Sequence, residues 1–72
     1  MKINNDVLTL SKNVRELRIN NGLSIAQLAK KARISVDTIS ALEKGIGNPL
    51  IGTLYKLSIA LKTKLYILCK GI

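Results

Sequence analysis

Basic side chains dominate the ionisable residues of this chain. Twelve lysines and arginines stand against four aspartates and glutamates, which gives a formal net charge of +8 on 72 residues. A surplus of this size on a small body creates a positive field that favours a polyanion, above all a nucleic acid. An acidic protein, a membrane surface or a merely solubilising charge are the alternatives that charge alone leaves open.

The chain has few residues that are suited to catalysis or metal binding. The chain has no histidine and one cysteine, Cys69, so neither a zinc cluster nor an internal disulfide can be assembled. The four carboxylates are scattered, and no glycine-rich phosphate loop is present. We therefore expect no enzymatic activity, no cofactor and no metal, and we interpret Cys69 as a small buried hydrophobic residue.

The N-terminal segment and the overall apolar pattern bear on location. The segment MKINNDVLTL is too polar for a signal peptide. No apolar stretch is long enough to span a membrane. With a lone cysteine that fits a reducing compartment, these features lead us to expect a cytoplasmic, nucleoid-associated protein.

Apolar residues recurring every three or four positions predict an all-α domain. The first helix is expected to run from about Asp6 to just before Asn20, Asn21 and Gly22. Asn48 is expected to cap a fourth helix with Pro49 in its first turn. That helix should end near Leu61 or Lys62, with an apolar face made of Leu50, Leu54, Leu57 and Leu61.

Two short helices are predicted in the middle of the chain. Ser24 caps the first, which runs to about Lys31, and Ser35 caps the second, which stops at Gly45. About three residues separate them, Ala32 to Ile34, so the two helices must cross at a steep angle. Such a pair has a familiar use, because the first helix braces across the DNA backbone while the second enters the major groove.

The C-terminal stretch TKLYILCKGI differs in character from the rest. A one-turn helix is possible, but the β-forming residues bounded by Thr63 and Gly71 favour a short strand. A lone strand needs a partner, and no other segment of the chain offers one. A strand would therefore pair with a second copy of the tail and make a homodimer, through Leu65, Tyr66, Ile67 and Leu68.

The middle pair and its flanks resemble the helix-turn-helix of the Cro/CI-type (XRE) regulator family over residues 7–62. The matching positions are Leu23, Ser24, Leu28, Ala29, Ser35, Ile39, Ser40, Glu43, Gly45 and Pro49. The resemblance implies a lambda-repressor-like bundle of four to five short helices. It also implies a single DNA-binding domain over 1–72, with 7–62 as the helical core and 63–72 as the dimerisation tail.

The resemblance also implies roles for individual residues. Base reading falls to Val36, Asp37, Thr38, Ser40 and Ala41. The expected phosphate contacts are the helix start at Ser24, Lys44 and Asn48. Beside the turn we add Lys30, Lys31 and Arg33, for which ordinary solvated charge is the alternative. Arg18 and Glu43 match a pair that ties the first helix to the third. The chain departs from the family pattern at three positions, with Arg33 for a turn glycine, Ile25 for a glutamine and Asn48 for an arginine.

The reading residues lack the arginine, asparagine and glutamine side chains that bind bases with two hydrogen bonds. The apolar groups of Val36, Thr38 and Ala41 could contact thymine methyls. The hydroxyls of Thr38 and Ser40 could reach a base or a phosphate. Asp37 could accept a hydrogen bond from cytosine N4, exclude other contacts, or simply favour a helix start through the dipole. We expect much of the affinity to come from phosphates and DNA shape.

The expected function is that of a homodimeric repressor that binds double-stranded operator DNA. The suspected C-terminal strand resembles the HipB-type antitoxin branch, which implies an autoregulating antitoxin with a kinase-like toxin as partner. A stand-alone or phage-type repressor and a protein-binding adaptor of the same fold remain the alternatives.

Overall fold

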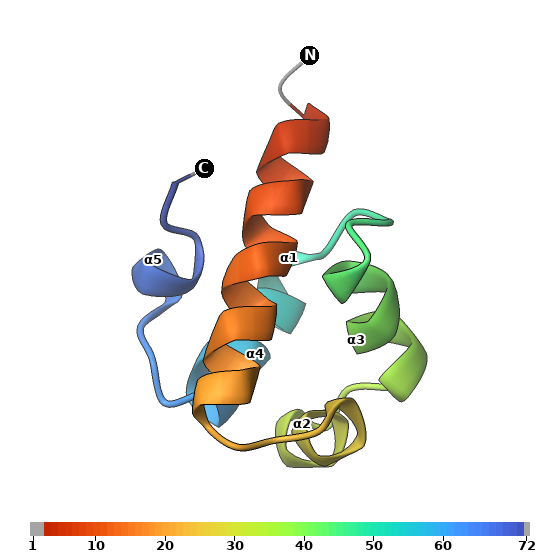
Figure 1. Ribbon diagram of the computed structural model, residues 1–72, viewed down its shortest axis with the longest axis vertical. Coiled ribbons are helices and arrows are strands. Elements are labelled where there is room, and N and C mark those ends of the chain that lie inside the picture. Colours follow the sequence, from red (N-terminus) through yellow and green to blue (C-terminus); the bar gives the residue numbers. More distant parts are fainter. Residues whose placement is uncertain (1–2, 72) are drawn as a thin grey trace.

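Five helices make up the regular structure of residues 3–71, the part of the chain that the computed structural model describes, with side chains described over residues 7–71. They are α1 (Ile3–Asn20), α2 (Ile25–Ala32), α3 (Val36–Glu43), α4 (Ile51–Ala60) and α5 (Leu65–Leu68). α1 runs the length of the molecule, with α3 and α5 on opposite sides of it in Figure 1. α1 begins at Ile3, earlier than the expected start near Asp6, and no glycine or proline interrupts the chain between them.

Aliphatic side chains from all five helices meet in one core. Val14 of α1, Leu28 of α2, Ile39 of α3 and Leu57 of α4 are fully buried. Leu68 of α5 joins them at 0% exposure, so the tail belongs to the same core as the other helices. Short helices of this kind are marginal alone, and mutual burial of their apolar faces is what stabilises them.

Each helix of the middle pair begins at the serine that the sequence indicates. The Ser24 hydroxyl accepts the Gln27 backbone N–H at 3.0 Å, and the Gln27 side-chain oxygen accepts the Ser24 N–H at 2.8 Å, which completes a capping box. The Ser35 hydroxyl accepts the Thr38 N–H at 3.0 Å. Four otherwise unpaired N–H groups open every helix, and these contacts satisfy some of them.

Arg33 closes α2 in the left-handed conformation, with φ 59° and ψ 46°. The Arg33 N–H donates to the Lys30 carbonyl, and the Ile34 N–H donates to the Ala29 carbonyl at 3.0 Å, a Schellman-type ending. A glycine is usual at such a position because a Cβ adds strain there. Arg33, which stands where the resemblance implies a glycine, thus keeps the left-handed geometry of the turn.

The expected start of α4 is wrong. The helix begins at Ile51, and its N-cap is Leu50, which is extended and makes no side-chain cap hydrogen bond. Pro49 therefore precedes the helix instead of lying in its first turn, and Asn48 is not its cap. Leu50 is 71% exposed and does not join the buried face, which Leu54, Leu57 and Leu61 form without it.

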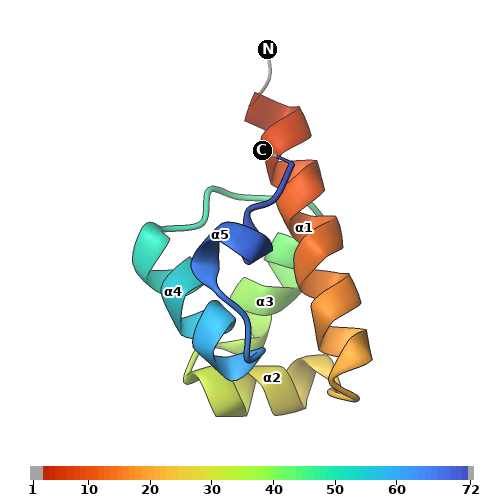
Figure 2. The same ribbon diagram turned by 90° about the vertical axis from the view of Figure 1, so that its left-hand side faces the viewer.

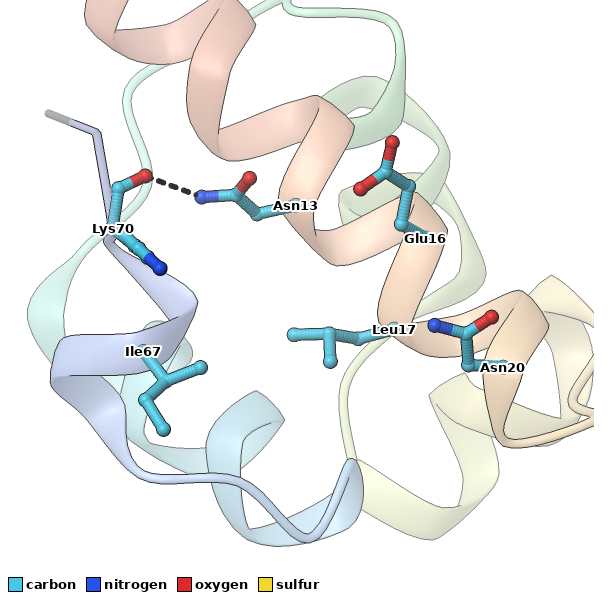
Figure 3. A pocket seen from close by; sticks show the side chains of 6 residues that line it. All are labelled: Asn13, Glu16, Leu17, Asn20, Ile67 and Lys70. Atoms are coloured by element: carbon cyan, nitrogen blue, oxygen red, sulfur yellow. Dashed lines mark hydrogen bonds between the residues drawn. The ribbon is translucent and has the colours of Figure 1, made fainter.

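The tail is the one-turn helix α5, and no strand occurs in residues 3–71. The alternative of a strand that pairs with a second copy is therefore corrected. The tail finds its partners within the chain, because the Asn13 amide nitrogen donates to the carbonyls of Leu68 at 2.9 Å and of Lys70 at 2.8 Å. Figure 2 shows α5 lying across α4 and beside α1, and Figure 3 shows Asn13 reaching Lys70 across a hollow between α1 and α5.

Candidate nucleic-acid interface

α3 has one buried face and one open face. Ile39 and Leu42 are 0% and 3% exposed and point into the core. On the other side Asp37 and Lys44 are exposed, and at seven positions apart they lie on one line along the helix. An α-helix with its side chains is about 10–12 Å across, and the major groove of B-form DNA is about 12 Å wide. The open face of α3 therefore has the size of a groove-binding element.

The residues expected to read bases divide into two groups. Val36, Asp37 and Thr38 are exposed, whereas Ser40 and Ala41, on either side of the line through Asp37 and Lys44, are half-buried. Ser40 lines a hollow toward α1 together with Arg15 and Glu43, and Ala41 lines one toward the α3–α4 loop. The sequence places all five residues on one helix. The structure shows that the first three are exposed and the last two are partly covered.

The Thr38 hydroxyl already has a partner. Its oxygen lies 2.7 Å from the Ser35 hydroxyl oxygen, which also accepts the Thr38 backbone N–H. A hydroxyl held in this way has less capacity left for a base or phosphate, since it offers one donor and two lone pairs in all. Between the two alternatives for Thr38, methyl or hydroxyl contact, the local geometry favours the methyl group.

Arg18 fixes α3 relative to α1 and α2. Its Nε donates to Glu43 Oε2 at 2.6 Å and its Nη2 donates to Glu43 Oε1 at 2.9 Å, so the ion pair is bidentate. Nη1 of the same side chain donates to the Leu23 carbonyl at 2.8 Å, in the segment before α2. The side chains are only 13% and 7% exposed. Hydrogen bonding to Glu43 raises the pKa of Arg18, so the guanidinium remains charged at any ordinary pH.

Exposed basic groups lie in the segments before and after α3. Lys30 and Lys31 occupy the last turn of α2, Arg33 lies in the turn before α3, and Lys44 follows the end of α3. The basic groups thus lie at both ends of the groove-sized helix, where the phosphates of a duplex would run. All the expected phosphate contacts are exposed: Ser24, Lys30, Lys31, Arg33, Lys44 and Asn48.

Two residues of this region escaped the sequence interpretation. Gln27 completes the capping box of α2, and the Ser-x-x-Gln spacing from Ser24 is the signal that could have found it. Arg15 lines a hollow with Arg18 and Lys44 beside the end of α3. Its position one helical turn before Arg18 was the available signal, because residues three apart share a helix face.

The arrangement of α2 and α3 defines the class of this protein. In Figure 1 α2 is viewed end-on while α3 is seen from the side, so the two helices are steeply inclined across the three residues that join them. This is a helix-turn-helix, with α3 in the position of the helix that enters the groove.

Sequence comparison then identifies the family. Residues 14–68 match the family model HTH_3, described as Helix-turn-helix. The HTH-type transcriptional regulator DdrOP3 of Deinococcus deserti is 35% identical over 65 residues, which cover 90% of this chain and 50% of that protein. The chain thus spans about half the length of this curated relative. It belongs to the helix-turn-helix family of the XRE type, whose members are DNA-binding transcription regulators rather than enzymes.

Solved structures show the same fold. An HTH_3 family transcriptional regulator from Vibrio cholerae superposes with a TM-score of 0.87 at 23% identity, over 92% of this chain and 37% of its own. A hypothetical transcription factor from Neisseria, NHTF, superposes with a TM-score of 0.84 at 28% identity, over 88% of this chain and 72% of its own. The all-helical bundle expected from the sequence is thereby confirmed.

Neither a membrane-spanning helix nor a cluster of metal-ligating side chains occurs in the described part of the chain. None of its helices combines the length and the apolar character needed to cross a lipid bilayer. Across residues 7–71, no three side chains among histidine, cysteine, aspartate and glutamate gather closely enough to hold a metal ion.

Proposed function

We propose that this protein binds double-stranded DNA through α3 and represses transcription by occupying an operator as a homodimer. The observation that carries the proposal is the open face of α3, exposed at Asp37 and Lys44 and flanked by basic side chains, on a helix whose other face is held in the core. Membership of a family of transcription regulators supports the same conclusion.

Fluorescence anisotropy with a labelled random-sequence duplex tests the proposal directly. Lys44→Ala and Lys70→Ala remove the same charge, the first beside α3 and the second on the tail near α1. Lys44→Ala should weaken binding several-fold, since a phosphate contact is lost. Lys70→Ala should change it little. Equal effects of the two variants, or no binding by the natural protein, would contradict the assigned interface and leave the adaptor alternative.

The homodimer is proposed from the geometry of DNA rather than from a strand. Two helix-turn-helix units bind half-sites about one turn of DNA, ~34 Å, apart. Of the residues expected at the dimer contact, Tyr66 and Ile67 are 71% and 40% exposed and are available to a second copy. Leu68 is fully buried within its own chain, and Leu65 is half-buried against the core.

Sedimentation of the paired variant Tyr66→Ser with Ile67→Ser therefore tests the dimer better than removal of the tail. Truncation would take Leu68 out of the core and could unfold the protein. We expect the paired variant to sediment as a monomer at concentrations where the natural protein is dimeric. A dimer that persists in the variant would place the contact elsewhere.

The antitoxin role depended on a C-terminal strand, and the tail is a helix packed in its own chain. We therefore propose the stand-alone repressor as the main function and keep the antitoxin as the second candidate. Co-expression with the product of the adjacent gene separates the two. A stable complex with a kinase-like protein would establish the antitoxin role.

A further inference from the structure

Asp37 is an acidic residue on the surface that would face DNA. It is exposed in the first turn of α3, on the line shared with Lys44. Within residues 7–71 the only ion pair joins Arg18 to Glu43, so Asp37 has no cationic partner there. Glu16 lies on α1 beside the hollow that α5 borders. Asp37 is thus set apart from the other described acidic side chains, because it lies on the open face of α3.

A carboxylate in this position is unfavourable against most of a DNA duplex. Ionised carboxylates only accept hydrogen bonds, and phosphates, guanine O6 and N7 and thymine O4 are acceptors too. Pressing Asp37 against any of these leaves a desolvated charge without a partner, which is costly. The favourable interaction of Asp37 with the dipole of α3 is present both with and without DNA. It therefore does not offset this cost of binding.

The major groove offers two kinds of hydrogen-bond donor to such a group, cytosine N4 and adenine N6. They differ in what lies beside the amino group. Adenine presents the N7 acceptor next to N6, which repels the second carboxylate oxygen, whereas cytosine presents a carbon-bound hydrogen next to N4. A carboxylate therefore favours cytosine over adenine, and both over guanine and thymine.

We propose that Asp37 selects cytosine at one position of each half-site, by accepting a hydrogen bond from N4 and by penalising the other bases there. Specificity built partly from repulsion of wrong partners is general in molecular recognition. The inference rests on the proposed function, since it assumes that α3 enters the major groove. It assigns to Asp37 two of the three roles that the sequence left open, acceptance from cytosine N4 and exclusion of other contacts.

Selection of bound duplexes from a random pool, followed by anisotropy on the selected site, tests this assignment. The natural protein should enrich a cytosine at one position of each half-site and lose roughly tenfold in affinity when that cytosine pair is changed to a thymine pair. Asp37→Ala should lose most of this discrimination and bind random-sequence duplex more tightly. Asp37→Asn should shift the preference to adenine, because an amide pairs with adenine N6 and N7.

Glu16→Ala is the matched control, because it removes the same charge from an exposed position on α1. It should keep the cytosine preference and raise random-sequence binding less than Asp37→Ala does. Circular dichroism of each variant checks that α3 remains folded. A natural protein that binds no duplex overturns the proposed function. Binding without an enriched cytosine, or a cytosine preference that survives in Asp37→Ala and Asp37→Asn, overturns this inference and leaves DNA binding intact.

Discussion

Arg18 near the end of α1 holds Glu43, the last residue of α3, through two hydrogen bonds of 2.6 and 2.9 Å. The same guanidinium also binds the Leu23 carbonyl in the segment that leads into α2. One side chain therefore sets the position of the groove-sized helix relative to two other segments. Because both partners are largely shielded from water, the pair is screened by salt less than a surface pair would be.

Breaking the Arg18–Glu43 pair should destabilise the fold. Arg18→Met leaves the Glu43 carboxylate shielded and unpaired, and we expect a loss of about 2–3 kcal/mol in the free energy of unfolding. The exposed Arg15→Met, one turn earlier on α1, should cost under about 0.5 kcal/mol. Urea denaturation measures the free energy of unfolding of both variants. Equal losses would show that the ion pair stabilises the fold no more than an exposed arginine does.

The contribution of the pair should not change between about pH 7 and pH 9. The pKa of Arg18 is raised in the folded protein, so its stabilising effect is complete below the pKa of the unfolded state. The effect is lost only as the pH rises through the still higher pKa of the folded state, far into the alkaline range. The difference in urea midpoint between the natural protein and Arg18→Met checks this at both pH values.

Asn13 should control how firmly the tail is attached. Asn13→Ala removes both hydrogen bonds from its amide to the carbonyls of Leu68 and Lys70, at a cost of about 1–3 kcal/mol. Hydrogen exchange should become faster at the amides of α5 and much less so in the rest of the molecule. Asn20→Ala, in the same hollow (Figure 3), is the control and should leave exchange in the tail unchanged.

Arg33 carries backbone strain together with its charge. It is left-handed at φ 59°, as is Lys62 at φ 57° after the end of α4. Arg33→Gly and Lys62→Gly should each raise the free energy of unfolding by about 0.5–1 kcal/mol through relief of that strain. Only Arg33→Gly should also weaken DNA binding, since it lies in the turn before α3. Thermal melts paired with anisotropy would separate the two effects, and equal losses of affinity would argue against a phosphate contact at Arg33.

DNA affinity should fall steeply with salt. The logarithm of the binding constant should decrease linearly with the logarithm of salt concentration, because each neutralised phosphate releases counterions. Lys44→Ala should make that slope smaller by about 1. A slope near zero for the natural protein would mean that the charge of +8 serves something other than phosphates.

Local rules were sufficient for the centre of the molecule. The caps at Ser24 and Ser35 and the apolar spacing around Leu28 and Ile39 predicted both helices of the pair to within about one residue. These features act over a few neighbouring residues, and the final fold does not oppose them. The start of α4 was missed because Asn48 followed by Pro49 looks like a helix start, whereas Leu50 is extended and the helix begins after it.

Sequence alone determined the class of this protein. The net charge follows from composition, and the two serine caps and the short connection are local features that need no knowledge of the fold. Only the tertiary structure decided the form of the tail. By local preference the run from Leu65 to Leu68 looks more like a strand than a one-turn helix, yet it is helical. The choice depends on partners far along the chain, namely the core that buries Leu68 and the Asn13 amide that binds its carbonyl.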